Sequence, residues 1–334
     1  MKPVVQMCPA AVLALGDRMQ APKLHAGEID ISAGLAARLI AEQLPQWAGL
    51  PVRPVASAGT ECVLYRLGND LVIRLPRRPG EHLDAFLTHG VLARLAPFLP
   101  VPIPELMAEG QPTADYPASW GVLRWLEGDT PVEGHLTEPG LLAADLAEFL
   151  RALWRIDVPK AGLADGPAAY RGGPLTDQHK FTLGAIKQAQ GQIDTNTARS
   201  IWDHAIQLPA WDGPNTLTHA DMMPGNILIR NGGLAAVIDF ATAGLGDPSQ
   251  DLIVAWMLLP DHVRPAFRKA IGVDDATWLR GRARALSMAL GQLDYYRETH
   301  PAMAGNARYT ISEVLADYHR TGNDTRPRNN HDPH

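Results

Sequence analysis

An Asn-Gly pair at Asn231 and Gly232, set between two apolar runs, is the feature of this sequence that most restricts its folding. Asn-Gly between such runs is a strong short-range signal for a two-stranded hairpin, because both residues tolerate the positive φ angles of a tight turn. The pattern predicts strands over residues 227–230 and 234–238, with the turn at 231–233. The residue before the first strand is thereby brought beside the residue after the second.

Polar side chains stand at both of these places. His219, Asp221 and Asn226 precede the first strand in the order H-x-D-x-x-x-x-N. Asp239 follows the second strand. In kinases, the Asp of this pattern accepts the proton of the substrate hydroxyl, while the Asn and a second Asp hold Mg²⁺ against the nucleotide phosphates. We therefore predict Asp221 as the proton acceptor and Asn226 and Asp239 as metal ligands. A turn-capping Asp221 is the structural alternative, and the joint spacing favours the catalytic interpretation.

Three neighbouring residues are expected to support this loop. The imidazole of His219 is expected to hold the backbone around Asp221 and Asp239. Asp247 precedes a helical segment and is predicted as its N-terminal cap. Asp251, at the start of the same helical segment, is predicted to brace the catalytic loop. None of the three is placed in the catalytic set.

The bulk composition sets the class of protein. A chain of 334 residues is long enough for two domains, and its 46% hydrophobic and 20% charged residues are ordinary for a globular enzyme. A net charge of −6 and a pI near 6.0 leave no basic excess to neutralise phosphates, which argues against a nucleic-acid partner. No apolar run approaches the roughly 20 residues that span a bilayer. Cys8 and Cys62 lack metal or disulfide spacing and favour a reducing cytoplasm.

The first part of the chain is rich in short strand-like runs. A helix is predicted over residues 31–44 behind a Ser32 cap, and a single helix over residues 82–95. Strands are predicted over residues 52–57, 62–67, 71–75, 103–108 and 120–125. Five strands with one inserted helix make a small antiparallel α+β lobe.

Helical periodicity dominates beyond residue 127. Helices are predicted over residues 141–156, 176–190, 197–208, 251–259, 264–271, 278–298 and 309–318. The fold class is therefore α+β, with a small lobe at residues 29–126 and a helical lobe at residues 127–320. Residues 1–28 are expected to be a disordered extension and residues 321–334 a loose tail. A cleft between the lobes is the expected place for a small ligand.

The motif region resembles the aminoglycoside/macrolide phosphotransferase family, antibiotic kinases distantly related to protein kinases. The segments HADMMPGNILI, AVIDF and GDPSQDL occur in the family's order within residues 217–252, and the likeness extends over residues 29–318. The resemblance implies a two-lobed protein-kinase-like fold. It also implies ATP or GTP as phosphoryl donor, Mg²⁺ as cofactor, and a small hydroxylated acceptor held by the helical lobe.

The resemblance also implies which residues of the small lobe bind the nucleotide. The turn at Ser57, Gly59 and Thr60 takes the place of the Gly-rich phosphate loop. Arg74 stands where kinases have the phosphate-binding Lys, and although Arg carries the same charge, the two side chains are not interchangeable. The hinge whose backbone would hold the base comprises Arg124, Trp125 and Leu126.

Two positions of the small lobe depart from the family's pattern. Thr88 falls where the family usually places a Glu partner for the basic residue, so Glu81 or Asp84 is expected to substitute for it. Glu61 and Cys62 stand where the family often has an Asp-Asn-like pair. These departures motivate one alternative, a weakly active nucleotide-binding pseudokinase.

The favoured function is transfer of the γ-phosphoryl group to a hydroxyl of an antibiotic of aminoglycoside or macrolide type, with resistance by inactivation. A metabolite kinase for choline, homoserine or a sugar is the alternative that keeps the mechanism. From Ala241 to the end, acidic and basic residues are equal in number, so no acidic excess indicates an aminoglycoside.

Overall fold

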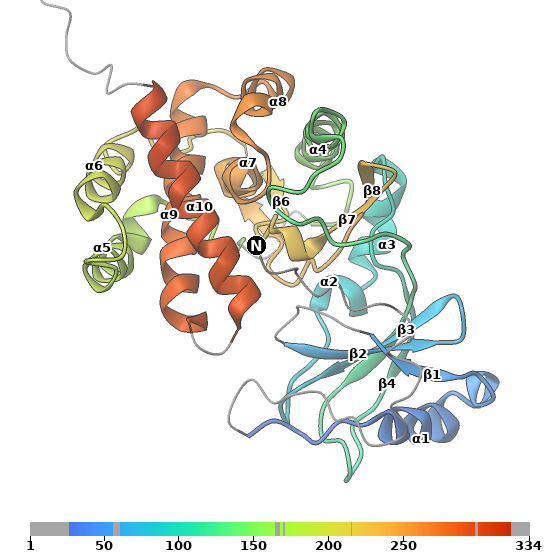
Figure 1. Cartoon of the computed structure of the whole chain (residues 1–334). Coiled ribbons are helices and arrows are strands. Elements are labelled where there is room, and N and C mark those ends of the chain that lie inside the picture. The colour runs from blue at the N-terminus through green and yellow to red at the C-terminus, as the bar shows by residue number, and fades with distance from the viewer. Residues whose placement is uncertain are drawn as a thin grey trace, which may run out of the picture. The chain divides into compact units, whose positions relative to one another are not determined.

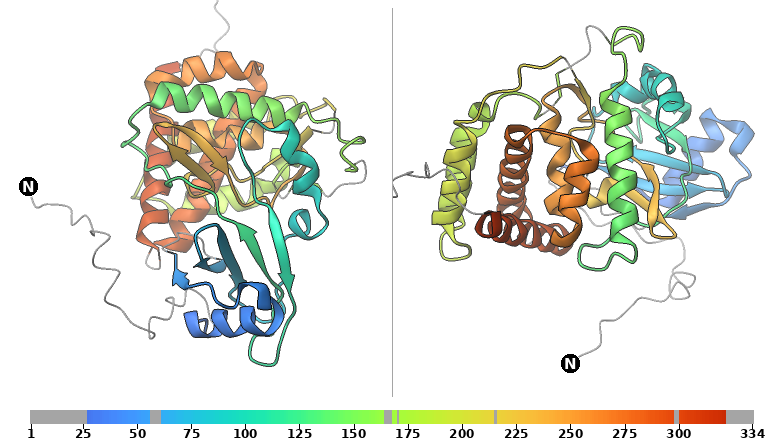
Figure 2. Two further views of the ribbon diagram at one scale, coloured as in Figure 1. Left: turned by 90° about the vertical axis from the view of Figure 1, so that its right-hand side faces the viewer. Right: turned by 90° about the horizontal axis from the view of Figure 1, so that it is seen from above.

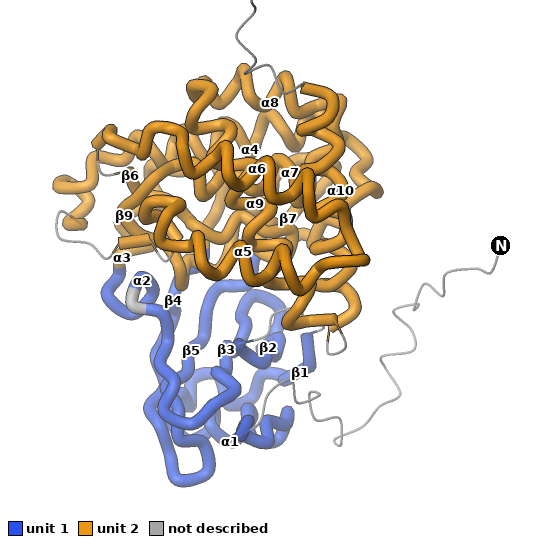
Figure 3. The backbone as a smooth tube through the Cα atoms, turned by 90° about the vertical axis from the view of Figure 1, so that its left-hand side faces the viewer, with its two compact units in different colours: residues 1–90, 104–126 blue, residues 91–103, 127–334 orange. Residues whose placement is uncertain are grey.

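The computed structural model describes residues 27–55, 61–163, 168–169, 171–214, 216–297 and 300–321. The chain divides into two compact units, one of Met1–Gly90 with Pro104–Leu126 and one of Val91–Ile103 with Glu127–His334 (Figure 3). The expected extension and tail lie outside the described residues except at their inner ends. There, the carboxylate of Glu28 is buried and accepts from Arg77 at 3.0 Å.

The first unit is built on a five-stranded antiparallel sheet (Figure 1). Its strands follow the order β1-β2-β3-β5-β4 across the sheet. Their bounds are β1 Val52–Pro54, β2 Cys62–Leu67, β3 Leu71–Pro76, β4 Leu106–Gly110 and β5 Trp120–Arg124. Residues of β2 alternate between half-buried and buried, so one face of this strand turns to the core. The five predicted strands are therefore confirmed, with shifted ends.

Helix α1, Ala33–Gln43, covers the apolar side of this sheet beside β1 (Figure 1). The hydroxyl of Ser32 accepts from the backbone N–H of Leu35, which confirms the predicted cap. Leu39 and Ile40 of the helix join Ile73 and Trp120 of the sheet in one buried core.

The single helix predicted over residues 82–95 is wrong. Two short helices occur instead, α2 Ala85–Thr88 and α3 Val91–Leu95. Gly90 between them adopts a φ of +64°, a left-handed conformation that ends a right-handed helix. The break also separates the two units, since the first unit's N-terminal part ends at Gly90.

The second unit is mainly helical. Figure 2 shows α9 and α10 side by side, with α5 and α6 packed against α9. The α-helices are α4 Pro139–Trp154, α5 His179–Gln188, α6 Thr195–Ala205, α7 Val254–Met257, α8 Arg264–Ile271, α9 Asp275–Tyr296 and α10 Pro301–Thr321. Over both units, the described residues include the 3₁₀ segments η2 Pro45–Trp47, η3 Ala96–Phe98, η4 Leu175–Gln178, η5 Pro224–Asn226, η6 Pro248–Ile253 and η7 Asp261–Val263. The helix predicted at 251–259 therefore begins as a 3₁₀ helix and continues as α7.

No helix in the described part of the chain has the length and apolarity needed to cross a membrane.

Two small sheets interrupt these helices. Strand β7, Ile227–Arg230, pairs with β8, Gly233–Val237, and β6, Thr216–Thr218, pairs with β9, Gly244–Gly246. The turn between β7 and β8 has φ angles of +53° at Asn231 and +81° at Gly232. The predicted hairpin is thus confirmed, together with the reason for its Asn-Gly pair.

Candidate active site

The loop between β6 and β7 holds Asp221 against Asn226. The side-chain amide of Asn226 donates from Nδ2 to Oδ2 and to the backbone carbonyl of Asp221, both at 2.9 Å. Because both contacts use the NH₂ group, the orientation of the amide is defined, and Oδ1 faces away from Asp221. Asp221 and Asn226 are both half-buried, so neither is sealed in the core.

The hairpin places Asp239 beside this pair. The backbone N–H of Ile238 donates to the carbonyl of Asn226 at 2.9 Å, so the residue after Ile238 lies at the same end of the hairpin as Asn226. Asp239 has a φ of +64°, a conformation that costs a non-glycine residue about 1–2 kcal/mol and is concentrated at functional sites. The three residues predicted from the motif therefore lie at the base of one hairpin, with a side-chain contact between Asp221 and Asn226.

His219 is fully buried beneath the loop. One ring nitrogen, Nε2, lies 3.0 Å from the carbonyl of Ile238, and the other, Nδ1, accepts from the backbone N–H of Asp221 at 3.3 Å. A carbonyl only accepts, so Nε2 carries the proton and the ring is neutral. Burial lowers the pKa of His219 to about 4, which agrees with the neutral form. His219 thus links the segments that carry Asp221 and Asp239, as predicted.

Asp251 supports the loop from the opposite side. Its carboxylate accepts the backbone N–H of His219 at 3.2 Å, that of Ala220 at 2.7 Å, and the indole N–H of Trp154 at 2.9 Å. Burial raises the pKa of Asp251 to about 6, against the lowering effect of these three donors. Ala220 has a φ of +64°, and these contacts hold it in that conformation. The predicted bracing role of Asp251 is confirmed.

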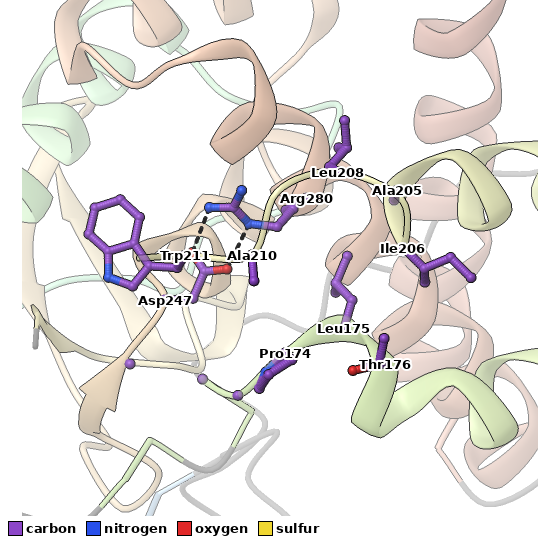
Figure 4. Close-up of a pocket in the computed structure, with 13 residues that line it drawn as sticks. Pro174, Leu175, Thr176, Ala205, Ile206, Leu208, Ala210, Trp211, Asp247 and Arg280 are labelled. Atoms are coloured by element: carbon purple, nitrogen blue, oxygen red, sulfur yellow. Dashed lines mark hydrogen bonds and ion pairs between the residues drawn. The ribbon is translucent and has the colours of Figure 1, made fainter. Parts of the chain in front are cut away.

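Asp247 is the predicted cap, and it also anchors a buried charge network. Its Oδ1 accepts from the backbone N–H of Ser249 at 2.9 Å, and its Oδ2 accepts from Arg280 at 2.8 Å and from Arg284 at 3.2 Å. Burial alone raises the pKa of Asp247, but the Arg280 hydrogen bond and the Arg284 charge outweigh it and lower that pKa. Figure 4 shows the Asp247–Arg280 pair beside a cavity of about 190 Å³.

Arg284 connects this network to the catalytic loop. It is 1% exposed and donates to Gln250 Oε1 at 3.3 Å, while Gln250 Nε2 donates to the carbonyl of Ala220 at 3.2 Å. Sequence reasoning did not select Gln250 or Arg284. Three arginines at alternate positions 280, 282 and 284, followed by the apolar run Ala285–Leu286, were the signal in the sequence, because arginines that are buried require partners.

The donor set at the hairpin base fits Mg²⁺. The amide oxygen of Asn226 and the carboxylate of Asp239 are hard oxygen ligands, and Mg²⁺ needs only one or two of these beside waters and substrate phosphates. Within the described residues no group of three or more His, Cys, Asp and Glu side chains has metal-site geometry. An Asn–Asp pair is a smaller donor set of the kind that magnesium–nucleotide complexes use.

The nucleotide-binding predictions fall on the first unit. Ser57, Gly59 and Thr60 lie outside the described residues. Arg74 is on β3, where its Nε donates to the thiol of Cys62 at 3.2 Å, so its guanidinium lies at the first residue of β2.

The hinge residues differ in whether their backbone N–H groups donate to a carbonyl of the described chain. The N–H of Arg124 donates to the carbonyl of Glu105, and the N–H of Trp125 donates to the carbonyl of Asp70 at 2.8 Å. Among the described residues, no carbonyl accepts the N–H of Leu126. The side chains of Arg124 and Trp125 are engaged as well, with Glu105 and with the guanidinium of Arg66.

The two expected substitutes for the helix Glu each accept a hydrogen bond from a nearby residue. Glu81 accepts from the Arg78 guanidinium at 2.7 Å, and Asp84 accepts from the backbone N–H of Phe86 at 2.8 Å, which caps α2. Thr88 donates from its hydroxyl to the carbonyl of Asp84 at 3.3 Å.

Solved structures show the same fold. The GDP and kanamycin complex of APH(2″)-IIia superimposes with a TM-score of 0.65 at 17% identity, covering 85% of this chain and 99% of that one. Macrolide 2′-phosphotransferase MphH from Brachybacterium faecium gives a TM-score of 0.56 at 21% identity, covering 84% and 97%. The gentamicin–APH(2″)-IIa complex gives 0.52 at 19% identity, covering 83% and 95%. These superpositions show a shared kinase-like phosphotransferase fold. At such low sequence identities they do not identify the acceptor substrate of this chain.

The sequence places the chain in a family. The model of the phosphotransferase enzyme (APH) family matches residues 52–286, and the chain belongs to that family. It is therefore a phosphotransferase. A search of curated protein sequences found no relative.

Proposed function

We propose that this phosphotransferase transfers the γ-phosphoryl group of ATP or GTP to a hydroxyl of an antibiotic of aminoglycoside or macrolide type, and so inactivates it in the cytoplasm. The observation that carries the proposal is the contact of Asp221 with Asn226 at the base of the β7–β8 hairpin, with Asp239 beside them. A small hydroxylated compound and a nucleoside triphosphate are the expected partners.

Asp221 is assigned the role of proton acceptor. The Asn226 amide holds Oδ2 of its carboxylate, which orients the group toward an incoming hydroxyl. The neutral imidazole of His219 keeps the backbone N–H of Asp221 in place without adding a positive charge that would weaken the base. A positioned base of this kind contributes about 10²–10⁴-fold to the rate.

Asn226 and Asp239 are assigned to the metal. When bound, Mg²⁺ neutralises charge on the donor phosphates during a loose transition state. The Asp221–Asn226 hydrogen bonds leave Oδ1 of Asn226 as the ligand atom. The bracing of Ala220 by Asp251 and Gln250 fixes the loop, so that these oxygens keep one geometry throughout the reaction.

The donor contacts are assigned to the first unit. Arg74 would neutralise phosphate charge, with Ser57, Gly59 and Thr60 forming the phosphate turn. Of the hinge residues Arg124, Trp125 and Leu126, we assign base recognition to Leu126. The N–H groups of Arg124 and Trp125 already donate within the described chain, so Leu126 has the backbone donor that a purine can use.

Asp221→Asn tests the assignment. The amide keeps the size of the side chain but accepts no proton, so kcat should fall by about 10²–10⁴-fold. Transfer is measured as labelled phosphate moved from Mg·ATP or Mg·GTP to a panel of hydroxylated antibiotics and metabolites. Nucleotide binding, followed by thermal shift, should be unchanged. Wild-type turnover in this variant would remove Asp221 from the mechanism.

A further inference from the structure

A side chain in the C-terminal half of α9 contacts the loop that carries Asp221. The amide of Gln292 donates from Nε2 to the sulfur of Met223 at 3.3 Å. Met223 is two residues after Asp221, and its backbone N–H donates to the carbonyl of Asp221 at 2.7 Å. Met223 and Gln292 are both half-buried, so this contact lies at the margin of the loop rather than in the core.

The amide of Gln292 is poorly satisfied by the protein. A thioether is a weak hydrogen-bond acceptor, and Oε1 of Gln292 is buried without a donor among the described residues. Leaving a buried polar atom unpaired is unfavourable, so such an atom in a folded protein calls for an explanation. A hydroxyl-bearing ligand beside Met223 would supply the missing partner if the side-chain amide, whose Oε1 is buried in this structure, turned toward it.

Two exposed aromatic rings continue this surface. Tyr295 lies one helical turn from Gly291 and Gln292 on α9 and is 60% exposed. Phe181 of α5 is 57% exposed and packs against α9 at Gly291, where an added Cβ would lie 2.7 Å from its ring. Gly291 therefore allows the Phe181 ring to lie close to the helix, at the residue that precedes Gln292 in the chain.

The charge of this surface does not suit a polycation. Residues 285–296 of α9 contain one acidic residue, Asp294, and α5 contains none. Asp294 is ion-paired with Arg297 at 3.7 Å, and α5 adds Lys180 and Lys187. An ammonium-rich ligand would meet no surplus of carboxylates here, whereas an apolar ring face gains from contact with exposed aromatic rings.

We propose that Phe181, Gly291, Gln292 and Tyr295 form an acceptor wall that selects a hydroxylated compound with an apolar ring face and at most one positive charge. This inference rests on the proposed function and chooses between its two acceptor types. The aromatic rings bind the ring face, and the Gln292 amide binds a neighbouring hydroxyl. Together they hold the compound against Met223, beside the carboxylate of Asp221.

Steady-state kinetics with two probe compounds, erythromycin and kanamycin, test the proposed acceptor wall. Erythromycin has a large apolar ring and one amine, and kanamycin has several ammonium groups. We expect kcat/KM for erythromycin to exceed that for kanamycin by about 100-fold or more, a difference that a few well-placed contacts supply. Binding of each probe to the full chain, followed by isothermal titration, should show the same order. Preference for kanamycin, or binding of neither probe, would overturn the proposal.

Variants of the wall separate specificity from folding. Phe181→Ala and Tyr295→Ala change exposed side chains, so folding should be unaffected. Each should raise KM for erythromycin about tenfold with kcat nearly unchanged, because the contact is made equally in the ground and transition states. Gln292→Glu should lower KM for kanamycin and raise it for erythromycin. Phe98→Ala is the matched control, since Phe98 is 62% exposed on η3, and it should change neither constant.

The two proposals fail in different ways. Transfer that depends on Asp221 but ignores Phe181, Gln292 and Tyr295 would remove the wall and leave the kinase assignment standing. Loss of all nucleotide-dependent transfer, with any acceptor, would remove the proposed function itself.

Discussion

The residues that hold the catalytic loop act through their protonation states. His219 is neutral because burial disfavours its charged form, and only the neutral ring both donates to Ile238 and accepts from Asp221. Asp251 has the opposite shift, since burial favours its protonated form, yet as a carboxylate it accepts three donors. Both groups therefore make the stability of the loop depend on pH.

His219→Gln should reduce the sensitivity of the fold to acid. The pKa of His219 falls from 6.5 to about 4 on folding, so between these values the unfolded chain binds a proton that the folded chain does not. Stability is therefore lost as pH falls through this window, by up to about 3 kcal/mol. The variant should lose less stability than the wild type between pH 7 and pH 4.5 in urea unfolding. Asp251, whose raised pKa acts in the opposite direction, is present in both proteins and cancels in the comparison. Equal losses would show that His219 does not titrate as described.

At the scale of elements, the β7–β8 hairpin places the candidate residues Asn226 and Asp239 at one end. Its turn requires positive φ at Asn231 and Gly232, and its other end joins Asn226 to Ile238. Gly232 also lies close to α4, since an added Cβ would approach Glu138 at 2.7 Å. The turn glycine is therefore constrained by both its backbone and its neighbours.

Gly232→Ala should lower both stability and transfer. The alanine would be strained at φ +81° and would clash with Glu138, and displacement of the turn would disturb Asn226 and Asp239. Gly191→Ala is a matched control, because Gly191 has a φ of +80° with open space around it. Both variants should lose about 1–2 kcal/mol from backbone strain, but only Gly232→Ala should also lower kcat. The measurements are urea unfolding and steady-state kinetics, and equal kinetics in the two variants would contradict the hairpin's positioning role.

At the scale of the whole molecule, the helical unit is organised around α9. Arg280 and Arg284 of this helix hold Asp247, and Arg284 also donates to the carbonyls of Arg171 and Gly173. The same helix presents Gln292 to the catalytic loop. One helix thus supports the loop's backbone from within and supplies the proposed acceptor wall at its end.

Arg284→Met should destabilise the protein by about 3–5 kcal/mol, because it leaves Asp247 and several carbonyls buried with fewer donors. Arg199→Met is the control. Arg199 pairs with Asp203 at 2.6 Å on the exposed face of α6, where an ion pair contributes about 0–1 kcal/mol. The midpoints of thermal unfolding measure the difference. Similar midpoints for the two variants would show that the buried network adds no stability.

Local patterns in the sequence predicted the hairpin, the Ser32 cap, the five strands and most helices. These features depend on turn residues and on periodicity within one segment, so neighbouring residues suffice to specify them. The break at Gly90 was missed because the apolar spacing of residues 82–95 continues across it, although the structure places a left-handed glycine and the end of the first unit's N-terminal part there.

The sequence by itself predicted the motif, since Asp221, Asn226 and Asp239 flank one short hairpin with an Asn-Gly turn. Only the tertiary structure decided what surrounds that motif. Arg284 lies 63 residues from Asp221 along the chain and reaches its loop through Gln250, and Gln292 meets Met223 across a comparable separation. Contacts between distant segments depend on how helices pack, and no local periodicity encodes which side chains meet there.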